Sequence, residues 1–221
     1  MTAATDTIRA EGLSFDTLPR EVSFTVEQGS VTIVLTAKEE IDACLVRLLL
    51  GFARPAGGRL FLFGTDISTL TDRGLTALRQ QIGLVYASGG LISNLKVWEN
   101  VTLPLAYSNR FSREQIEQMG LAVLDRIGYI GKLMALPGHI TLFQKRLAGF
   151  ARTMLTDPDM VIYESPLSGL NQEERSRFLS TASDFHLEKA GRTSLFLSST
   201  PEIVPLLKNA RVITLSQGQL P

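Results

Sequence analysis

The chain has 221 residues, 44% of them hydrophobic, which suits one large domain or two small ones with a sizeable core. Its 22 Lys and Arg residues balance 22 Asp and Glu residues, which argues against a nucleic-acid-binding protein that works through a broad basic surface. The single cysteine, Cys44, cannot form an internal disulfide, and no signal peptide or bilayer-spanning apolar run of about 18 residues is visible, so we expect a cytoplasmic protein.

The first third of the chain alternates between strand and helix patterns. Short runs of β-branched and aromatic residues, separated by polar breaks, predict strands. These predicted strands cover residues 8–15, 22–26, 31–36, 59–63 and 82–86. Residues 39–50 instead have the apolar spacing of a helix, and Gly51 follows at the position of a C-cap glycine.

The middle of the chain, from Val97 to about Met154, is predicted to be mostly helical. One helix start is marked by a Ser-x-x-Gln pattern at Ser112. From there on we expect helices over 112–127, 144–155, 172–185 and 202–208 and strands over 160–163, 193–198 and 211–215. This order predicts an α/β domain with an inserted helical subdomain.

Four stretches of the sequence resemble, in order and spacing, the ATPase subunits of ATP-binding cassette (ABC) transporters. They are RLLLGFARPAGGRLFLFGTDI (47–67), IGLVYASGGLISNLKVWENVTLPL (82–105), TDPDMVIYESPLSGLN (156–171) and TSLFLSST (193–200). They are similar, respectively, to the segment after the family's phosphate loop, the Q-loop, the Walker B strand with the D-loop, and the switch strand. The resemblance extends over essentially the whole chain.

The resemblance implies the P-loop-NTPase-like ABC ATPase fold, an α/β fold with an N-terminal antiparallel β part and an inserted helical subdomain. It implies one domain over residues 1–221, with the helical subdomain over about 88–155. Residues 89–105 are closest in form to the branch that serves bacterial lipid transporters with MCE-type partners. Lipid transport is therefore the process that this finer resemblance implies.

The phosphate-loop positions depart from the family's G-x-x-x-x-G-K-[ST] pattern, in which backbone N–H groups and the lysine hold the phosphates. In order, the two glycines, the lysine and the magnesium-binding hydroxyl correspond to Thr36, Ile41, Asp42 and Ala43. Asp42 and its neighbours Glu39 and Glu40 would place negative charge where a polyphosphate should lie. Each such contact costs on the order of 4 kcal/mol at about 4 Å and an effective dielectric near 20.

The other positions of the resembled site are also altered. They are Ala87 for the Q-loop glutamine, Thr141, Leu142, Phe143 and Gln144 in the signature, Glu164 for the Walker B aspartate, Ser165 for the catalytic glutamate, Asn171 for the D-loop aspartate and Ser199 for the switch histidine. Phe15 falls at the adenine-stacking position, where it is either a stacking residue or part of the core.

Phosphoryl transfer depends on a positioned cation, a metal and a water-orienting residue. Because the groups that supply them are missing or altered, the sequence predicts a non-catalytic, structural or regulatory subunit with no catalytic residue, no metal ligand and no cofactor. The alternative is a divergent but active transporter ATPase that uses ATP and magnesium. A third reading is a remodelled site that holds another ligand.

The resemblance also implies partners and a location. We expect a membrane permease subunit, a second ABC ATPase-like chain, or both, in a homo- or hetero-dimer with no role for nucleic acid. The chain would be cytoplasmic and peripheral on the inner face of the cytoplasmic membrane.

The start of the helix after residue 36 has a further signal of its own. Thr36 and Glu39 have the spacing of a capping box, which predicts a helix from near Ala37. The acidic residues of its first turn suit the positive end of the helix dipole, so we expect the protein's own carboxylates to stand in for a nucleotide.

Overall fold

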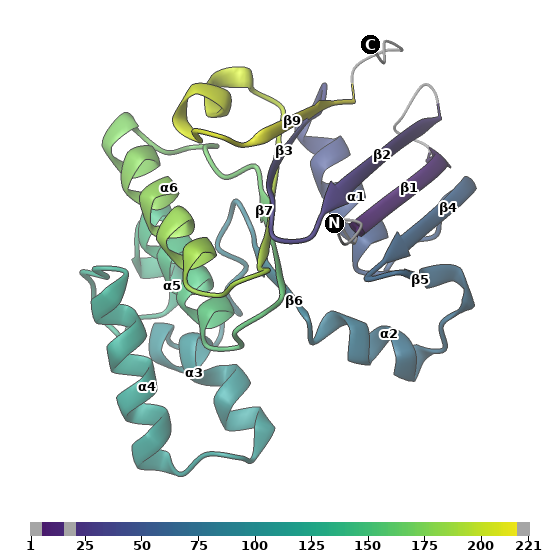
Figure 1. The fold of residues 1–221 in the computed structure, drawn as a ribbon. Helices are drawn as coiled ribbons and strands as arrows, with labels where there is room; N and C mark the ends of the chain where they lie inside the picture. Colours follow the sequence, from purple (N-terminus) through teal and green to yellow (C-terminus); the bar gives the residue numbers. More distant parts are fainter. Residues whose placement is uncertain (1–5, 16–20, 216–221) are drawn as a thin grey trace.

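The structure is a computed structural model that describes residues 6–15 and 21–215 (Figure 1). Its strands are β1 (Asp6–Ser14), β2 (Val22–Glu27), β3 (Val31–Leu35), β4 (Gly57–Leu62), β5 (Thr65–Asp66), β6 (Ile82–Val85), β7 (Met160–Glu164), β8 (Thr193–Ser198) and β9 (Arg211–Thr214). Its α-helices are α1 (Glu39–Leu49), α2 (Asp72–Arg79), α3 (Val97–Ser108), α4 (Arg113–Arg126), α5 (Leu142–Met154) and α6 (Gln172–Leu187). Short 3-10 helices are η1 (Ile67–Thr69), η2 (Pro137–His139) and η3 (Pro201–Leu206).

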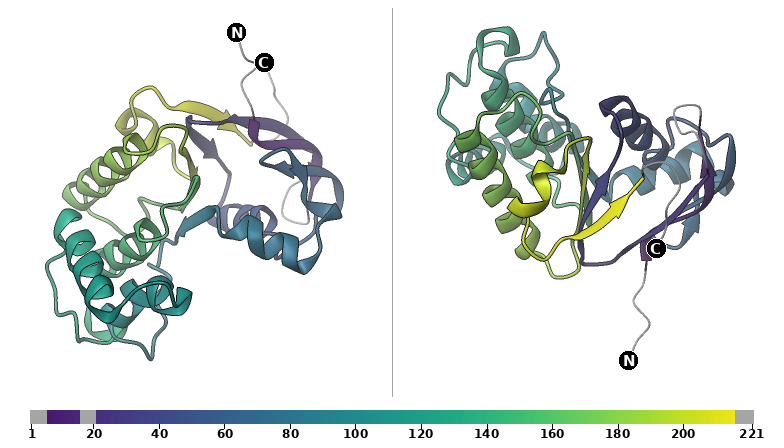
Figure 2. Two further views of the ribbon diagram at one scale, coloured as in Figure 1. Left: turned by 60° about the horizontal axis from the view of Figure 1, so that its bottom comes forward. Right: turned by 90° about the horizontal axis from the view of Figure 1, so that it is seen from above.

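The strands form two sheets of different kinds. An antiparallel sheet has the order β2-β1-β4-β5, and a parallel sheet has the order β6-β7-β8-β3-β9 (Figures 1 and 2). Helices α3, α4 and α5 all lie in the segment between β6 and β7. The expected α/β fold, with an antiparallel N-terminal part, is thus confirmed.

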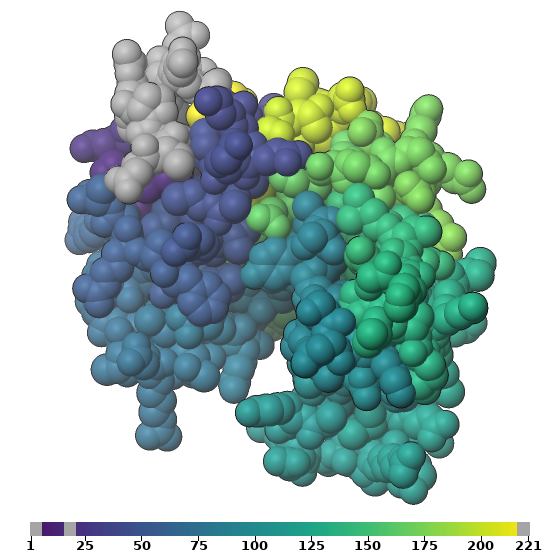
Figure 3. Space-filling view, turned by 180° about the vertical axis from the view of Figure 1, so that it is seen from behind, coloured from purple at the N-terminus to yellow at the C-terminus, as the bar shows by residue number. Residues whose placement is uncertain are grey.

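Two apolar cores cover the two faces of the parallel sheet. On one face, α1 packs between the parallel and the antiparallel sheets, and Leu45 and Leu49 are among its buried residues. On the other face, α3, α4, α5 and α6 pack over side chains such as Tyr163 and Phe196. Figure 3 shows a notch between the part of the surface that contains α2 and the tip formed by α3 and α4.

Helix ends follow the local signals closely. Ser112 caps α4, with its hydroxyl accepting from the Gln115 N–H and the Gln115 side chain accepting from the Ser112 N–H, which confirms the predicted start. At the end of α1, Gly51 adopts a φ of +64°, and the Phe52 N–H donates to the carbonyl of Arg47 at 2.8 Å. Glycine accepts this left-handed conformation without strain, as the sequence predicts.

Some elements differ from the expectation. Residues 201–206 form the 3-10 helix η3 in place of an α-helix, because Pro205 has no N–H to donate within the turn. Helix α2 and strand β5 were not predicted, since both are short and mostly exposed. Among the described residues, no helix is long and apolar enough to cross a membrane.

Candidate functional site

The carboxyl ends of the parallel strands bring most of the expected site residues together. Thr36, Ser165 and Ser199 directly follow β3, β7 and β8, which are neighbours in the sheet. The Thr36 N–H donates to the carbonyl of Ser198 at 2.9 Å, and the Ser165 N–H donates to the carbonyl of Leu197 at 3.0 Å. Because ligands of open α/β sheets bind outside this edge, it is the candidate site.

Asp42 lies at the centre of this edge, fully buried in the first turns of α1. The Thr36 hydroxyl donates to Asp42 Oδ1 at 2.6 Å, and the Ser165 hydroxyl donates to Asp42 Oδ2 at 2.7 Å. No Lys or Arg of the described residues forms an ion pair with this carboxylate. Burial therefore raises the pKa of Asp42, and the charge of Glu39 adds to this, although the two hydroxyl bonds oppose it.

Ser165 holds its end of this network in an unusual backbone conformation. Its φ is +42°, in the left-handed region that residues with a side chain rarely adopt. The residue is buried, and its hydroxyl points to a partner 123 positions earlier in the chain. Backbone strain at such a position persists only where the surroundings enforce it.

Glu164, the last residue of β7, adds a second carboxyl group beside Asp42. Burial raises the pKa of Glu164, and the charges of Asp42 and Glu39 raise it further, while a backbone hydrogen bond from Ala87 lowers it. Glu164 and Ala87, the expected Walker B and Q-loop positions, are therefore in contact. Among the described residues, no group of three or more His, Cys, Asp or Glu side chains is placed to hold a metal ion.

The expected capping box at the start of α1 is wrong. The helix begins at Glu39, with Lys38 as the N-cap and no side-chain hydrogen bond to the first turn. The Thr36 hydroxyl donates to Asp42 Oδ1 at 2.6 Å instead, and the carbonyl oxygen of Lys38 lies farther from it, at 3.2 Å. A threonine hydroxyl has one proton to donate, and the buried carboxylate is the stronger acceptor.

Two hollows flank the start of α1. A small one of about 230 Å³, the strand-end hollow, is lined by residues that include Glu39, Ser165, Ser199 and Arg175. Arg175 is paired there with Glu202 at 2.7 Å. The hollow is rich in hydroxyl groups, so its wall can exchange hydrogen bonds with a polar ligand.

The second hollow, the α1 cleft, has a volume of about 490 Å³. Phe15, Glu40 and Ala43 line it, which places three of the expected positions on one wall. Sequence reasoning missed its two exposed arginines, Arg47 and Arg54. The signal for Arg47 was available in the sequence, because Arg47 lies four residues after Ala43 and therefore on the same helix face.

The signature positions lie elsewhere, at the start of α5. Thr141 and Gln144 form a capping box, so their side chains serve the helix end, and Gln144 Nε2 also donates to the carbonyl of Ile130 at 2.6 Å. Leu142 is partly exposed, and Phe143 lies beneath the guanidinium of Arg177, 5.6 Å from the ring centroid. The bulky side chains of Leu142 and Phe143 thus occupy two positions of the expected signature.

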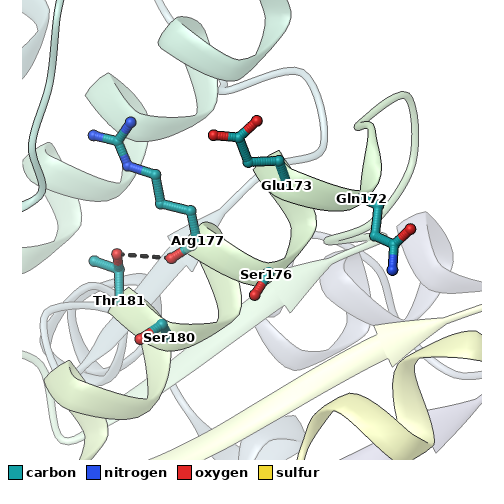
Figure 4. Close-up of a pocket in the computed structure, with 6 residues that line it drawn as sticks. All are labelled: Gln172, Glu173, Ser176, Arg177, Ser180 and Thr181. Carbon is teal, nitrogen blue, oxygen red and sulfur yellow. Dashed lines mark hydrogen bonds between the residues drawn. The ribbon is translucent and has the colours of Figure 1, made fainter.

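Asn171 has a similar role at α6. Its side chain accepts from the Glu174 N–H at 3.0 Å, and the Glu174 carboxylate accepts from the Asn171 N–H at 3.0 Å. Figure 4 shows the helix that follows, where residues such as Glu173 and Arg177 line a shallow groove of about 760 Å³. Every side chain of this groove comes from α6, so it is a helix surface with no second wall of its own.

Arg146 is a central residue of the site that sequence reasoning missed. It is almost fully buried in α5, and its guanidinium donates to the carbonyls of Ala87, Pro166 (2.5 Å) and Ser168 (2.7 Å). Burial lowers the pKa of Arg146 to about 10, which leaves it charged at neutral pH. The side chain ties the loop after β6 to the loop after β7. The sequence signal for this residue was an arginine on the apolar face of the helix predicted over 144–155.

The arrangement at the start of α1 does not fit a polyphosphate as it stands. The charge of Glu39 raises the pKa of both Asp42 and Glu164, and each oxygen of Asp42 already accepts a hydrogen bond from an internal hydroxyl. These carboxyl groups would repel an incoming phosphate. We therefore derive no catalytic step through ATP or magnesium at this site.

Comparison of the chain with solved structures confirms the fold. CbiO1 from Clostridium perfringens, described as part of the ABC transporter complex cbiONQ, superposes with a TM-score of 0.78 over 95% of this chain and 84% of its own, at 21% identity. The dimeric ABC transporter cassette MJ0796 superposes with a TM-score of 0.81 over 94% of each chain, at 17% identity. The chain has the ABC ATPase fold.

Sequence relatives agree with this assignment. No family model matches the chain. The protein named methionine import ATP-binding protein MetN 2 from Burkholderia mallei is 29% identical over 201 residues, which are 91% of this chain and 50% of the relative. MetN from Rhizobium meliloti is 28% identical over 199 residues, which are 90% of this chain and 55% of the relative. The chain spans about half the length of these relatives and is similar to them over nine-tenths of its own length.

These relatives overturn one expectation. The sequence predicted a non-catalytic subunit, but the proteins that match nine-tenths of the chain are named as ATP-binding proteins of an import system. The prediction was wrong because it judged each motif position by its side chain alone. It let the altered motif positions outweigh the whole-chain resemblance, whereas the similarity of nine-tenths of the chain to these proteins points to the alternative of a divergent ATPase subunit.

Proposed function

We propose that the chain is the ATP-binding subunit of an ABC transporter and that it couples ATP hydrolysis to solute transport. The observation that carries the proposal is the similarity over nine-tenths of the chain to proteins named for ATP binding in methionine import. The ABC ATPase fold supports it. The transported solute would be of the amino-acid class. Lipid transport has no support among these relatives.

The α1 cleft supplies the surface for a nucleotide in this proposal. Phe15 belongs to the apolar core and is 5% exposed, so it closes one wall of the cleft, and the exposed Arg47 and Arg54 offer two guanidinium groups for phosphates outside the altered loop. The degenerate phosphate-loop positions from Thr36 to Ala43 would form the far side of the site. Magnesium, if bound with ATP, would be held mainly by the phosphates, because the described residues form no metal cluster.

A transporter subunit needs partners, and the proposal includes them. We infer a membrane permease and a second ABC ATPase chain, because one structural neighbour is described as part of a transporter complex and another as a dimer. The chain would then be cytoplasmic and peripheral on the membrane.

Calorimetric titration with ATP and magnesium, followed by measurement of phosphate release, tests the proposal. We expect a dissociation constant in or below the millimolar range, about −4 kcal/mol or stronger, and slow turnover. Arg54→Gln should weaken binding, whereas the matched control Arg73→Gln, which is exposed on α2 outside the cleft, should not. Absence of both binding and phosphate release from the folded protein would reject ATP coupling.

A further inference from the structure

A cleft of about 660 Å³ lies between the outermost strands of the two sheets, and none of the residues that line it belongs to α1. Strand β2 ends the antiparallel sheet, and β9, yellow in Figure 2, ends the parallel sheet. An ion pair of 2.9 Å between Glu27 and Arg211 shows that these two strands lie next to each other. Residues 9–11 of β1, 23–25 of β2 and 211–214 of β9 line the hollow, which we name the edge cleft.

Half of the peptide groups of β9 point away from its sheet. The Leu215 N–H donates to the carbonyl of Leu35 at 2.8 Å, so residues 211, 213 and 215 direct their N–H and C=O groups at β3. Because successive residues of a strand alternate, the peptide groups of Val212 and Thr214 point to the other side, where no described strand pairs with them. Both residues are exposed and line the edge cleft. They offer a row of strand-spaced donors and acceptors to a ligand.

The charged side chains of the edge cleft favour an acidic ligand. Among the described residues that line it, Arg9 and Arg211 are cations and Glu11 is an anion. Glu11 pairs with Arg9 and, at 3.0 Å, with Arg59, while Arg211 pairs with Glu27. Three arginines thus stand against two glutamates, and all five side chains are at least one-third exposed. Exposed ion pairs of this kind are weak, so the arginines can exchange them for the carboxylate of a ligand.

We propose that the edge cleft binds an extended, acidic segment of a partner polypeptide, which adds a strand to β9. An extended backbone carries N–H and C=O groups at the spacing of Val212 and Thr214, so these groups select a strand. Acidic side chains at alternate positions of the segment would face Arg9 and Arg211. This inference stands on the edge of the sheet and is independent of ATP binding.

Binding of blocked peptides to the whole chain, followed by amide chemical shifts, tests the proposal. The probe is an acetylated and amidated peptide in which glutamate and valine alternate. One control has lysine in place of glutamate, and the other has N-methylated backbone amides. We expect the probe to bind about tenfold tighter or more than either control, because lysines repel the arginines and N-methylated amides cannot pair with an edge.

The two control peptides can each overturn part of the proposal. If the N-methylated peptide bound as tightly as the probe, the segment would not add as a strand. If the lysine peptide bound as tightly as the probe, the cleft would not select an acidic segment.

Variants of the protein separate the edge from its charge. Val212→Pro removes an outward N–H and leaves the ladder with β3 intact, so it should weaken binding of the probe about tenfold or more. The matched control Val212→Thr keeps the N–H and should bind like the parent. Arg211→Gln should weaken binding about threefold, with the exposed Arg73→Gln on α2 as its control. Parent-like binding by folded Val212→Pro, or equal binding by the two arginine variants, would contradict the proposal.

Amide hydrogen exchange of the chain without peptide identifies any other occupant of the edge. We expect the amides of Val212 and Thr214 to exchange faster than those of Ile213 and Leu215, and to slow when the probe binds. Equal protection of all four amides in the monomer would mean that the chain covers its own edge. Protection that rises with protein concentration would mean that a second copy covers it. Either result would overturn the binding of a partner segment.

Discussion

Tyr163 and Phe196 stack face to face on neighbouring strands, with ring centroids 4.4 Å apart and planes 7° from parallel. The two residues are direct partners in the register of β7 and β8. Phe150 and Phe178 pack edge-on against Tyr163 from the helices above. The ring is fully buried, and its hydroxyl makes no well-formed hydrogen bond among the described residues, although the Ser194 side chain lies near enough to favour the ionised form weakly.

Tyr163→Phe should therefore maintain or increase stability. The substitution keeps the stacked ring and removes a buried hydroxyl whose loss of hydration is not offset by a good hydrogen bond. This should raise the free energy of unfolding by about 1 kcal/mol. Chemical denaturation of the parent, Tyr163→Phe and the exposed control Tyr107→Phe measures this. A loss of more than about 1 kcal/mol in Tyr163→Phe alone would mean that the hydroxyl has a partner after all.

Arg146→Gln should be strongly destabilising. The guanidinium donates from a buried position to three carbonyls in two loops, and removing it leaves those acceptors without donors, at a cost of about 3 kcal/mol or more. Arg146→Lys should recover only part of the loss, because a lysine lacks the planar fork that reaches several carbonyls. Urea unfolding is the measurement, with the exposed Arg47→Gln as control. Equal midpoints for Arg146→Gln and Arg47→Gln would contradict this role.

Asn171 should behave as a helix cap. Asn171→Ala should cost about 1 kcal/mol of unfolding free energy, because α6 loses the acceptor for the Glu174 N–H. Asn171→Asp should leave stability within about 0.5 kcal/mol, since both residues are good N-caps. Thermal unfolding with Ser180→Ala as control tests this. A large loss in Asn171→Asp would show that the amide group has another task.

Stability should fall as the pH rises through the titration of Asp42. Burial raises the pKa of Asp42 above its ordinary value of 3.8, so between these two values the folded chain holds a proton that the unfolded chain has released. Unfolding then releases protons, and the free energy of unfolding decreases with increasing pH. The groups that face this carboxyl are the acids Glu39 and Glu164 and the hydroxyls of Thr36 and Ser165.

Asp42→Asn should flatten this decline and make the chain more stable than the parent at neutral pH. Part of the slope should remain, because the pKa of Glu164 is raised by burial in the same direction. Urea unfolding at a series of pH values from about 4 to 7 measures it, with the exposed Asp184→Asn as control. If the free energy of unfolding had the same pH dependence in the parent and in Asp42→Asn, Asp42 could not be a buried carboxyl group without a cationic partner.

The fold was accessible from the sequence because its signals are local and strong. The strand β8 coincides with its predicted range, and the capping box at Ser112 fixed the start of α4. Helix α2 was missed, since its apolar face is small and Leu78 is its only buried residue. At 201–206 the prolines favoured a tighter helix than periodicity alone could indicate.

The candidate site could be predicted from the sequence only in part. Family spacing placed Thr36, Asp42 and Ser165 at one site, but the direction of the Asp42 side chain depends on a partner 123 residues away. Local spacing therefore paired Thr36 with Glu39 as a capping box. In the folded chain the Thr36 hydroxyl donates to Asp42 instead. Arg146 was missed because its acceptors are backbone carbonyls, so the sequence shows an arginine on an apolar helix face but not the groups that it binds.

The strand order of the parallel sheet has a consequence for how the chain is made. Strand β3 lies between β8 and β9, so both of its neighbours come from the last 29 of the 221 residues. During synthesis the apolar strand Val31–Leu35 therefore emerges long before either partner exists, whereas the antiparallel sheet is complete by Asp66. An unpaired apolar strand is a site of aggregation. The nascent chain must keep β3 protected, by α1 or by a chaperone, until β8 and β9 have left the ribosome.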